Sequence, residues 1–148
     1  MDDNAQLLLS SLVALSLGVV TMLVLTVRRR LVPEHDEDQT VRLAVIRLFQ
    51  LAARGDHEGA ATLLAYTGSG EARSGDVLHF SRPEDAEEVA RRCKELQELT
   101  RQGGMTVDQV RREGDACTCQ ITFNGPTRLT KVLTMRRARE RWALYHVE

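Results

Sequence analysis

The chain has 148 residues, with 20 basic and 21 acidic side chains and a net charge of -1. Charges of both signs are interspersed, so no strong field draws the chain to nucleic acid, and we expect no nucleic-acid partner. Outside an apolar N-terminal segment about 118 residues remain, which is the usual size of one compact domain.

This apolar segment runs from Ala5 to Val27 and contains no charged residue. As a helix it would span about 34 Å, slightly more than the ~30 Å hydrocarbon core of a bilayer. A cleavable signal peptide would begin with Lys or Arg, whereas this chain begins with Met-Asp-Asp-Asn. The sequence therefore predicts a permanent transmembrane anchor within residues 1–30.

Three arginines, Arg28, Arg29 and Arg30, follow the apolar segment directly. Basic flanks favour the cytoplasmic side of a membrane, so we expect the N-terminus outside and the remaining domain in the cytoplasm. A periplasmic domain is the alternative. Small residues recur every four positions along one face of the predicted anchor: Ser10, Ala14 and Gly18. Such a stripe lets a second transmembrane helix pack closely, although small residues are also common in membrane helices in general.

The stretch from Leu31 to Gln39 is acidic and contains Pro33, which interrupts a helix, so it is predicted to be a solvated linker. The domain is predicted to occupy residues 40–148. Its first helix is predicted from Gln39 to Arg54, because apolar residues recur there with helical period on one face. These residues are Val41, Ala44, Val45, Leu48 and Ala52.

Two further helices are predicted. Asp56 is placed to cap a short helix from His57 to about Tyr66. Ser81 and Glu84 form a capping-box pattern at the start of a longer helix that ends before Gly103-Gly104. The buried face of this longer helix is predicted to contain Ala86, Val89, Ala90, Cys93, Leu96 and Thr100.

Beyond Met105 the apolar residues recur with period two, which is typical of strands with one buried face. Asn-Gly at positions 124–125 is a signal for a tight hairpin. The pattern predicts an antiparallel meander of four strands, at about Thr106–Arg112, Ala116–Phe123, Arg128–Arg137 and Arg141–Val147.

The three cysteines, Cys93, Cys117 and Cys119, show no disulfide spacing. Cys117 and Cys119 alternate with polar residues on a predicted strand, so their sulfur atoms point to the same face. A structural zinc site takes four ligands, and no second pair or nearby His supplies them. We expect buried, reduced thiols, no metal and no cofactor.

The segments VRLAVIRLFQLAARGDHEGAATLL, RREGDACTCQITF, TRLTKVLTMRR and RERWALYHVE resemble the nuclear transport factor two-like (cystatin-like) superfamily. The likeness is to its small bacterial domains similar to lumazine-binding-like proteins, and it covers residues 40–148. It implies an α+β domain in which about three helices pack into a curved four-stranded antiparallel sheet, making a cone that can hold a pocket. It does not define an activity, because one fold hosts many functions.

Enzymes of this superfamily carry an Asp or a His–Asp pair inside the cone, and the candidates here are Asp108, His146 and His79. Isolated titratable residues usually lie at the surface, so none is assigned a catalytic role. Trp142 and Tyr145 have opposite parity on the last strand and are expected to point to opposite faces. Either could be a core residue or a contact for a partner or a pocket.

The apolar segment and the lack of a recognisable catalytic constellation favour a non-catalytic accessory or assembly subunit of a larger membrane protein complex, for example a respiratory or photosynthetic one. The expected location is the bacterial inner membrane. Expected partners are other transmembrane helices of that complex or a second copy of the chain, with the soluble domain as a protein-interaction module. The alternative is a membrane-tethered small-molecule binder or enzyme that uses a pocket in the cone.

Overall fold

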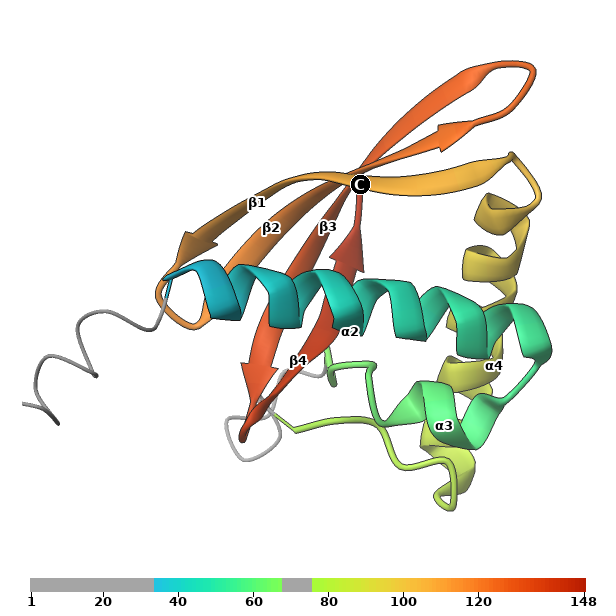
Figure 1. Ribbon diagram of the computed structural model, residues 1–148. Helices are drawn as coiled ribbons and strands as arrows, with labels where there is room; N and C mark the ends of the chain where they lie inside the picture. Colours follow the sequence, from blue (N-terminus) through green and yellow to red (C-terminus); the bar gives the residue numbers. More distant parts are fainter. Residues whose placement is uncertain (1–33, 68–75) are drawn as a thin grey trace, which may run out of the picture. The chain divides into compact units, whose positions relative to one another are not determined.

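The computed structural model describes residues 34–67 and 76–148. Within these residues, three helices pack on a curved four-stranded antiparallel sheet, so the predicted α+β class is confirmed (Figure 1). Asp38–Glu148 forms one compact unit. The elements are α2 (Glu34–Arg54), α3 (His57–Ala61), α4 (Pro83–Thr100), β1 (Gly104–Glu113), β2 (Ala116–Asn124), β3 (Arg128–Ala138) and β4 (Arg141–Val147). The strands follow one another across the sheet in chain order, which confirms the predicted meander.

Helix α2 begins at Glu34, earlier than the predicted start at Gln39, so most of the stretch predicted as a linker is helical. The predicted apolar face is confirmed, and it also includes Phe49. Its fully buried members are Val41, Val45, Leu48, Phe49 and Ala52.

Helix α3 is capped as predicted but is shorter than expected. The Asp56 carboxylate accepts a hydrogen bond from the backbone N–H of Gly59 at 2.9 Å. The helix ends at Ala61 because the following residues pair with the sheet, where Leu64 forms a parallel bridge to Leu144 of β4. The prediction that this helix continues to about Tyr66 is therefore wrong, because pairing with β4 outweighs the helical pattern of the sequence.

The capping box predicted for α4 does not form. The N-cap residue is Arg82, not Ser81, and no side chain caps the helix. A different carboxylate organises this end of the helix: Asp85, only 2% exposed, accepts a hydrogen bond from the backbone N–H of His79 at 3.0 Å. This bond connects the first turn of α4 to the segment that precedes it.

The main core lies between the helices and one face of the sheet. Alternate residues of β2 point into it and are fully buried: Cys117, Cys119, Ile121 and Phe123. The rings of Phe49 on α2 and Phe123 lie 5.8 Å apart, which joins the first helix to the sheet. The predicted alternation of β2 is thus confirmed.

Two β-bulges interrupt the ladders, one at Asp108 in β1 and one at Tyr145 in β4. An extra residue on one strand bends it and increases its twist, which accounts for part of the curvature of the sheet. At the first bulge the guanidinium group of Arg42 on α2 donates to two backbone oxygens of β1. It contacts the Val107 oxygen and, at 3.3 Å, the Asp108 oxygen.

The predicted hairpin between β2 and β3 is present, but it is not a two-residue turn. Asn124 pairs with Arg128, so three residues connect the strands. Gly125 is required here by close packing, because a Cβ atom at this position would lie 1.7 Å from the backbone oxygen of Gln102. The β2–β3 hairpin is therefore packed against the end of α4.

Candidate functional site

The predicted membrane features lie outside the described residues. These are the anchor within residues 1–30, the stripe of Ser10, Ala14 and Gly18, and the flank of Arg28, Arg29 and Arg30. In the part of the chain that the structure does describe, no helix is long and apolar enough to cross a membrane.

Asp108, the first acid–base candidate, lies on the outer face of the sheet. Its carboxylate accepts hydrogen bonds from the hydroxyl groups of Thr122 and, at 3.3 Å, Thr106. Thr122 alternates along β2 with Ile121 and Phe123, which face the helices. Asp108 therefore points away from the interior where a cone pocket would form.

The two histidine candidates are also near the surface. His79 Nε2 lies 3.7 Å from the carboxylate of Asp76, and the two side chains are 41% and 33% exposed. His146 is exposed on β4, opposite Thr134. None of the hydrogen bonds or ion pairs found for residues 34–67 and 76–148 joins two of the three candidates, so they do not form one catalytic group.

The interior of the domain is apolar. Most of the buried apolar side chains from α2, α4 and the sheet pack against one another in one large cluster. Among the described residues, the buried side chains that are polar or charged are Asp85, Arg92 and Thr122, and Thr122 faces outward. A ligand pocket needs several polar groups that converge on one cavity, and the described core residues do not supply such a set.

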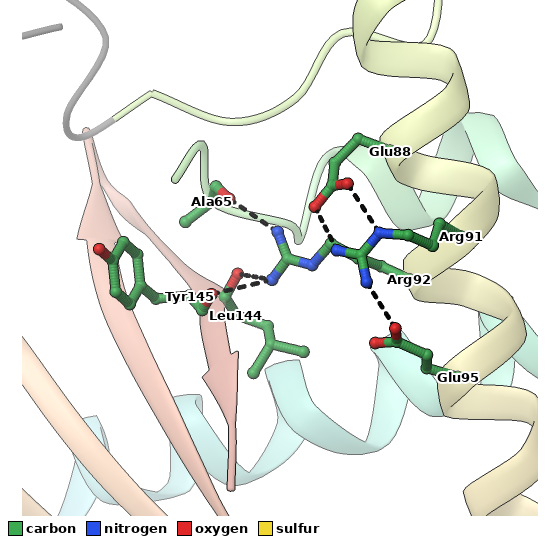
Figure 2. A network of polar contacts seen from close by, with 7 residues as sticks. All are labelled: Ala65, Glu88, Arg91, Arg92, Glu95, Leu144 and Tyr145. Atoms are coloured by element: carbon green, nitrogen blue, oxygen red, sulfur yellow. Dashed lines mark hydrogen bonds and ion pairs between the residues drawn. The ribbon is translucent and has the colours of Figure 1, made fainter. Parts of the chain in front are cut away.

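Arg92 is the most unusual of these residues, because it is a charged side chain that is only 6% exposed (Figure 2). From α4 it donates hydrogen bonds to the backbone oxygens of Ala65 at 2.8 Å, Leu144 at 2.6 Å and Tyr145 at 3.3 Å. Burial lowers the pKa of Arg92 from its usual value, and the negative charge of Glu88 opposes this shift. Arg92 thus holds together three segments: α4, β4 and the strand-like segment after α3.

The neighbouring Arg91 has the opposite environment. It is 56% exposed and forms ion pairs with Glu88 and Glu95 on the surface of α4. Its hydrogen bond to Glu88 raises the pKa of Arg91. Figure 2 shows the two guanidinium groups pointing in different directions, one toward backbone oxygens and one toward carboxylates.

Cys117 and Cys119 are buried on the helix-facing side of β2, as predicted. The Cys117 thiol donates to the backbone oxygen of Thr118 at 3.9 Å. The interaction between the two thiols lowers the pKa of Cys117 and raises the pKa of Cys119. Cys93 on α4 is buried elsewhere in the core, and burial raises the pKa of its thiol. All three cysteines are free thiols.

Trp142 and Tyr145 pack into different clusters, as their parity predicts. Trp142 is 4% exposed and belongs to the main core, whereas Tyr145 packs beside Ala143 in a smaller cluster. The guanidinium carbon of Arg136 lies 3.7 Å from the centre of the Tyr145 ring, a cation–π contact. A role for either residue in contacting a partner stays a prediction.

Large apolar side chains are exposed at several positions of the described chain. Leu43 is 59% exposed and Ile46 is 37% exposed. Because they are three residues apart on α2, they share one face of that helix. Val132 on β3, 37% exposed, and Phe80, 39% exposed, lie elsewhere.

Two surface grooves adjoin α4. The larger, of about 350 Å³, is lined by His57, Ala90, Lys94, Gln97, Glu98 and Arg101. The smaller, of about 220 Å³, is lined by Tyr66, Thr67, Leu78, Glu84, Asp85 and Glu88. No residue of the sheet lines either groove, so neither of them is the interior of the cone.

Solved structures with this arrangement have the NTF2-like fold. A de novo designed NTF2 fold protein, NT-9, superimposes with a TM-score of 0.50 at 12% identity, over 74% of this chain and 84% of that one. An NTF2-like protein with a cystatin-like fold from Novosphingobium aromaticivorans superimposes with a TM-score of 0.45 at 22% identity, over 84% of this chain and 85% of that one. A putative NTF2-like transpeptidase from Campylobacter jejuni superimposes with a TM-score of 0.45 at 11% identity, over 69% of this chain and 94% of that one.

The domain therefore has an NTF2-like fold, as the sequence resemblance implies. No protein-family model and no curated protein matches the sequence. Identities this low define a fold and not an activity. The fold alone does not decide whether this chain is a catalyst.

Proposed function

We propose that the chain is a non-catalytic, membrane-anchored accessory or assembly subunit of a larger membrane protein complex, with the NTF2-like domain as its protein-interaction module. One observation carries this proposal: apolar side chains fill the helix-facing side of the sheet, while Leu43 and Ile46 on α2 expose apolar surface. Apolar groups that a domain leaves outside its own core are available to a partner.

The face of α2 that contains Leu43 and Ile46 suits a protein contact. The exposed Arg47 follows Ile46 in the sequence, and arginine is enriched at protein interfaces. The chain's predicted anchor also limits the reach of this face. The partner that we propose is therefore itself a membrane protein or a second copy of the chain.

Mild cross-linking of the full chain in its own membrane, followed by detergent extraction, tests this proposal. We expect a cross-linked species that contains an integral membrane protein or a second copy. Leu43→Glu and Ile46→Glu should each reduce the yield of this cross-linked species. Val132→Glu is the control, because it changes an apolar residue on the sheet that is as exposed as Ile46, and it should leave the yield unchanged. An isolated monomer in every preparation, or equal behaviour of all three variants, would contradict the proposal.

The alternative, a membrane-tethered binder or enzyme that uses the cone, predicts a different result from the same preparation. A small molecule would be retained by the domain and released on unfolding, with no protein partner. Retention of a small molecule would also support the predicted likeness to lumazine-binding-like bacterial domains.

The proposed location is the bacterial inner membrane with the domain in the cytoplasm. A single reporter cysteine in residues 31–39, in a chain whose three natural cysteines are replaced, tests the orientation. A membrane-impermeant thiol reagent should label it in lysed cells and not in intact spheroplasts. Labelling in intact spheroplasts would instead place the domain in the periplasm.

A further inference from the structure

The register of β2 and β3 places three buried sulfur-containing residues next to one another on the two strands. Cys117 and Cys119 are two residues apart on β2 and share its helix-facing side. Met135 on β3 is the direct cross-strand partner of Cys117 and is fully buried. Directly opposed residues have their Cβ atoms about 5 Å apart, and the unbranched Met side chain adapts to irregular space.

The two thiols are not placed to form a disulfide with each other. The register between β2 and β3 runs without a shift from Ala116 to Asn124, so this part of β2 is a regular strand. With a rise of about 3.4 Å per residue, the Cα atoms of Cys117 and Cys119 are about 7 Å apart and their Cβ atoms point the same way. A disulfide requires Cβ atoms about 3.8 Å apart, so both cysteines stay as thiols, the form from which a metal ligand is made.

We propose that Cys117, Cys119 and Met135 form a binding site for Cu(I), with the two thiolates as the principal ligands and the thioether as the third. Thiolate and thioether sulfurs are the soft ligands that Cu(I) prefers, and this ion is satisfied by two or three of them. A structural zinc ion takes four ligands. In the described part of the chain, no group of three or more His, Cys, Asp and Glu side chains is placed to hold a metal, so the thioether is the donor that completes this set.

The binding step balances without any oxidant or reductant. Two thiols and one Cu(I) ion give a bis-thiolate complex of net charge minus one and two protons, which leave to solvent. Charges of both signs act on this thiol pair: Arg42 and Arg112 favour the thiolate form, and Asp38 opposes it.

The position of the site gives a route for the ion. Cys117 is the second residue of β2 and lies next to the two-residue turn that joins β1 to β2, at one end of the sheet (Figure 1). Ends of elements open locally at a much lower free energy than the central core does. Transient opening at this turn exposes the two thiols without global unfolding.

The test uses the full chain, purified in detergent under anaerobic reducing conditions, and titrated with Cu(I) buffered by the chromogenic chelator bicinchoninate. We expect the wild-type chain to take one Cu(I) from the chelator. Cys117→Ser and Cys119→Ser should each lose this binding. Cys93→Ser is the matched control, because it removes a third buried thiol of the same core and should retain one Cu(I).

Met135→Leu separates a ligand from a packing residue, because the two side chains have similar volume. It should keep the stoichiometry but lower the affinity by about tenfold, the lower end of what a supporting group contributes to a metal site. X-ray absorption of the loaded wild-type chain should show sulfur-only coordination. The fluorescence of the buried Trp142 confirms that each variant is folded.

Three results would overturn the proposal. The first is a wild-type chain that takes no Cu(I) from bicinchoninate. The second is loss of binding in Cys93→Ser to the same extent as in folded Cys117→Ser, and the third is nitrogen or oxygen coordination in the X-ray absorption spectrum. Because none of these measurements involves a membrane partner, they are independent of the outcome of the cross-linking experiment.

Discussion

Replacing Arg92 by Met should destabilise the domain far more than the same change at Arg91. The Arg92 guanidinium is the hydrogen-bond donor found for the backbone oxygen of Ala65, at 2.8 Å. The Leu144 oxygen would keep a partner, because it also accepts from the Ala65 N–H at 2.7 Å. The variant therefore leaves the buried Ala65 oxygen without this donor. It also removes a charge-assisted bond from the Leu144 oxygen and the longer bond, at 3.3 Å, from the Tyr145 oxygen.

These losses set the expected magnitude. An unsatisfied buried carbonyl costs about 1–3 kcal/mol, and a hydrogen bond to a charged group contributes about 1.5–3 kcal/mol. Relief of the buried charge offsets part of the sum, as the lowered pKa of Arg92 indicates. We expect the free energy of unfolding to fall by about 3 kcal/mol, which corresponds to a drop in Tm of about 10–15 °C for a domain of this size.

The assay is urea unfolding of the full chain in detergent, followed by the emission of Trp142, the one tryptophan of the chain. Its side chain is 4% exposed in the main core, so its emission reports loss of that core. Arg91→Met is the control, because its side chain is 56% exposed and surface ion pairs contribute at most about 1 kcal/mol. Equal shifts in the unfolding midpoint for the two variants would refute the assignment of Arg92 as a buried clamp.

Three further predictions use the same unfolding assay. Gly125→Ala should lower the free energy of unfolding by about 2 kcal/mol or more, because the new Cβ would lie 1.7 Å from a backbone oxygen. Gly104→Ala is the control: its new Cβ would meet nothing within 4 Å, so the free energy of unfolding should stay nearly unchanged. An equally small effect of Gly125→Ala would contradict the packing described for the hairpin. Asp85→Ala should lower the free energy of unfolding by about 1–3 kcal/mol, because the buried Asp85 carboxylate accepts from the backbone before α4. Ser81→Ala should leave it almost unchanged, because no side chain caps α4. A larger effect of Ser81→Ala than of Asp85→Ala would indicate that the capping box forms after all. Asp56→Ala should cost about 1 kcal/mol through loss of the N-cap of α3, and an unchanged midpoint would show that this cap does not contribute.

Periodicity in the sequence predicted most of the fold. The alternation of Cys117, Cys119, Ile121 and Phe123 located β2, and the helical spacing of Val41, Val45 and Leu48 located α2. These patterns are reliable because each element buries one face, and burial selects apolar residues at the period of the element. The boundaries were less predictable, because the end of α3 depends on pairing with β4, which is distant in the sequence.

Helix α4 shows why the polar groups of the core were missed. Asp85, Val89, Arg92 and Leu96 have the spacing of one helix face, and all four are buried. The spacing was visible in the sequence, but charged side chains such as those of Asp85 and Arg92 are normally exposed to solvent, so neither was predicted to be buried. What makes Arg92 suitable for the core is a set of backbone oxygens from two other segments, and only the folded chain brings these together.

The bulge at Asp108 and the contact of Arg42 with β1 determine what a neighbouring molecule can do at this side of the sheet. An outermost strand offers unpaired amide and carbonyl groups on which another chain can form a further strand. Here one residue of β1 is out of register, and the oxygens of Val107 and Asp108 already accept from Arg42. An incoming strand would have to displace that guanidinium and straighten the bulge, so Arg42 protects the protein against edge-to-edge aggregation.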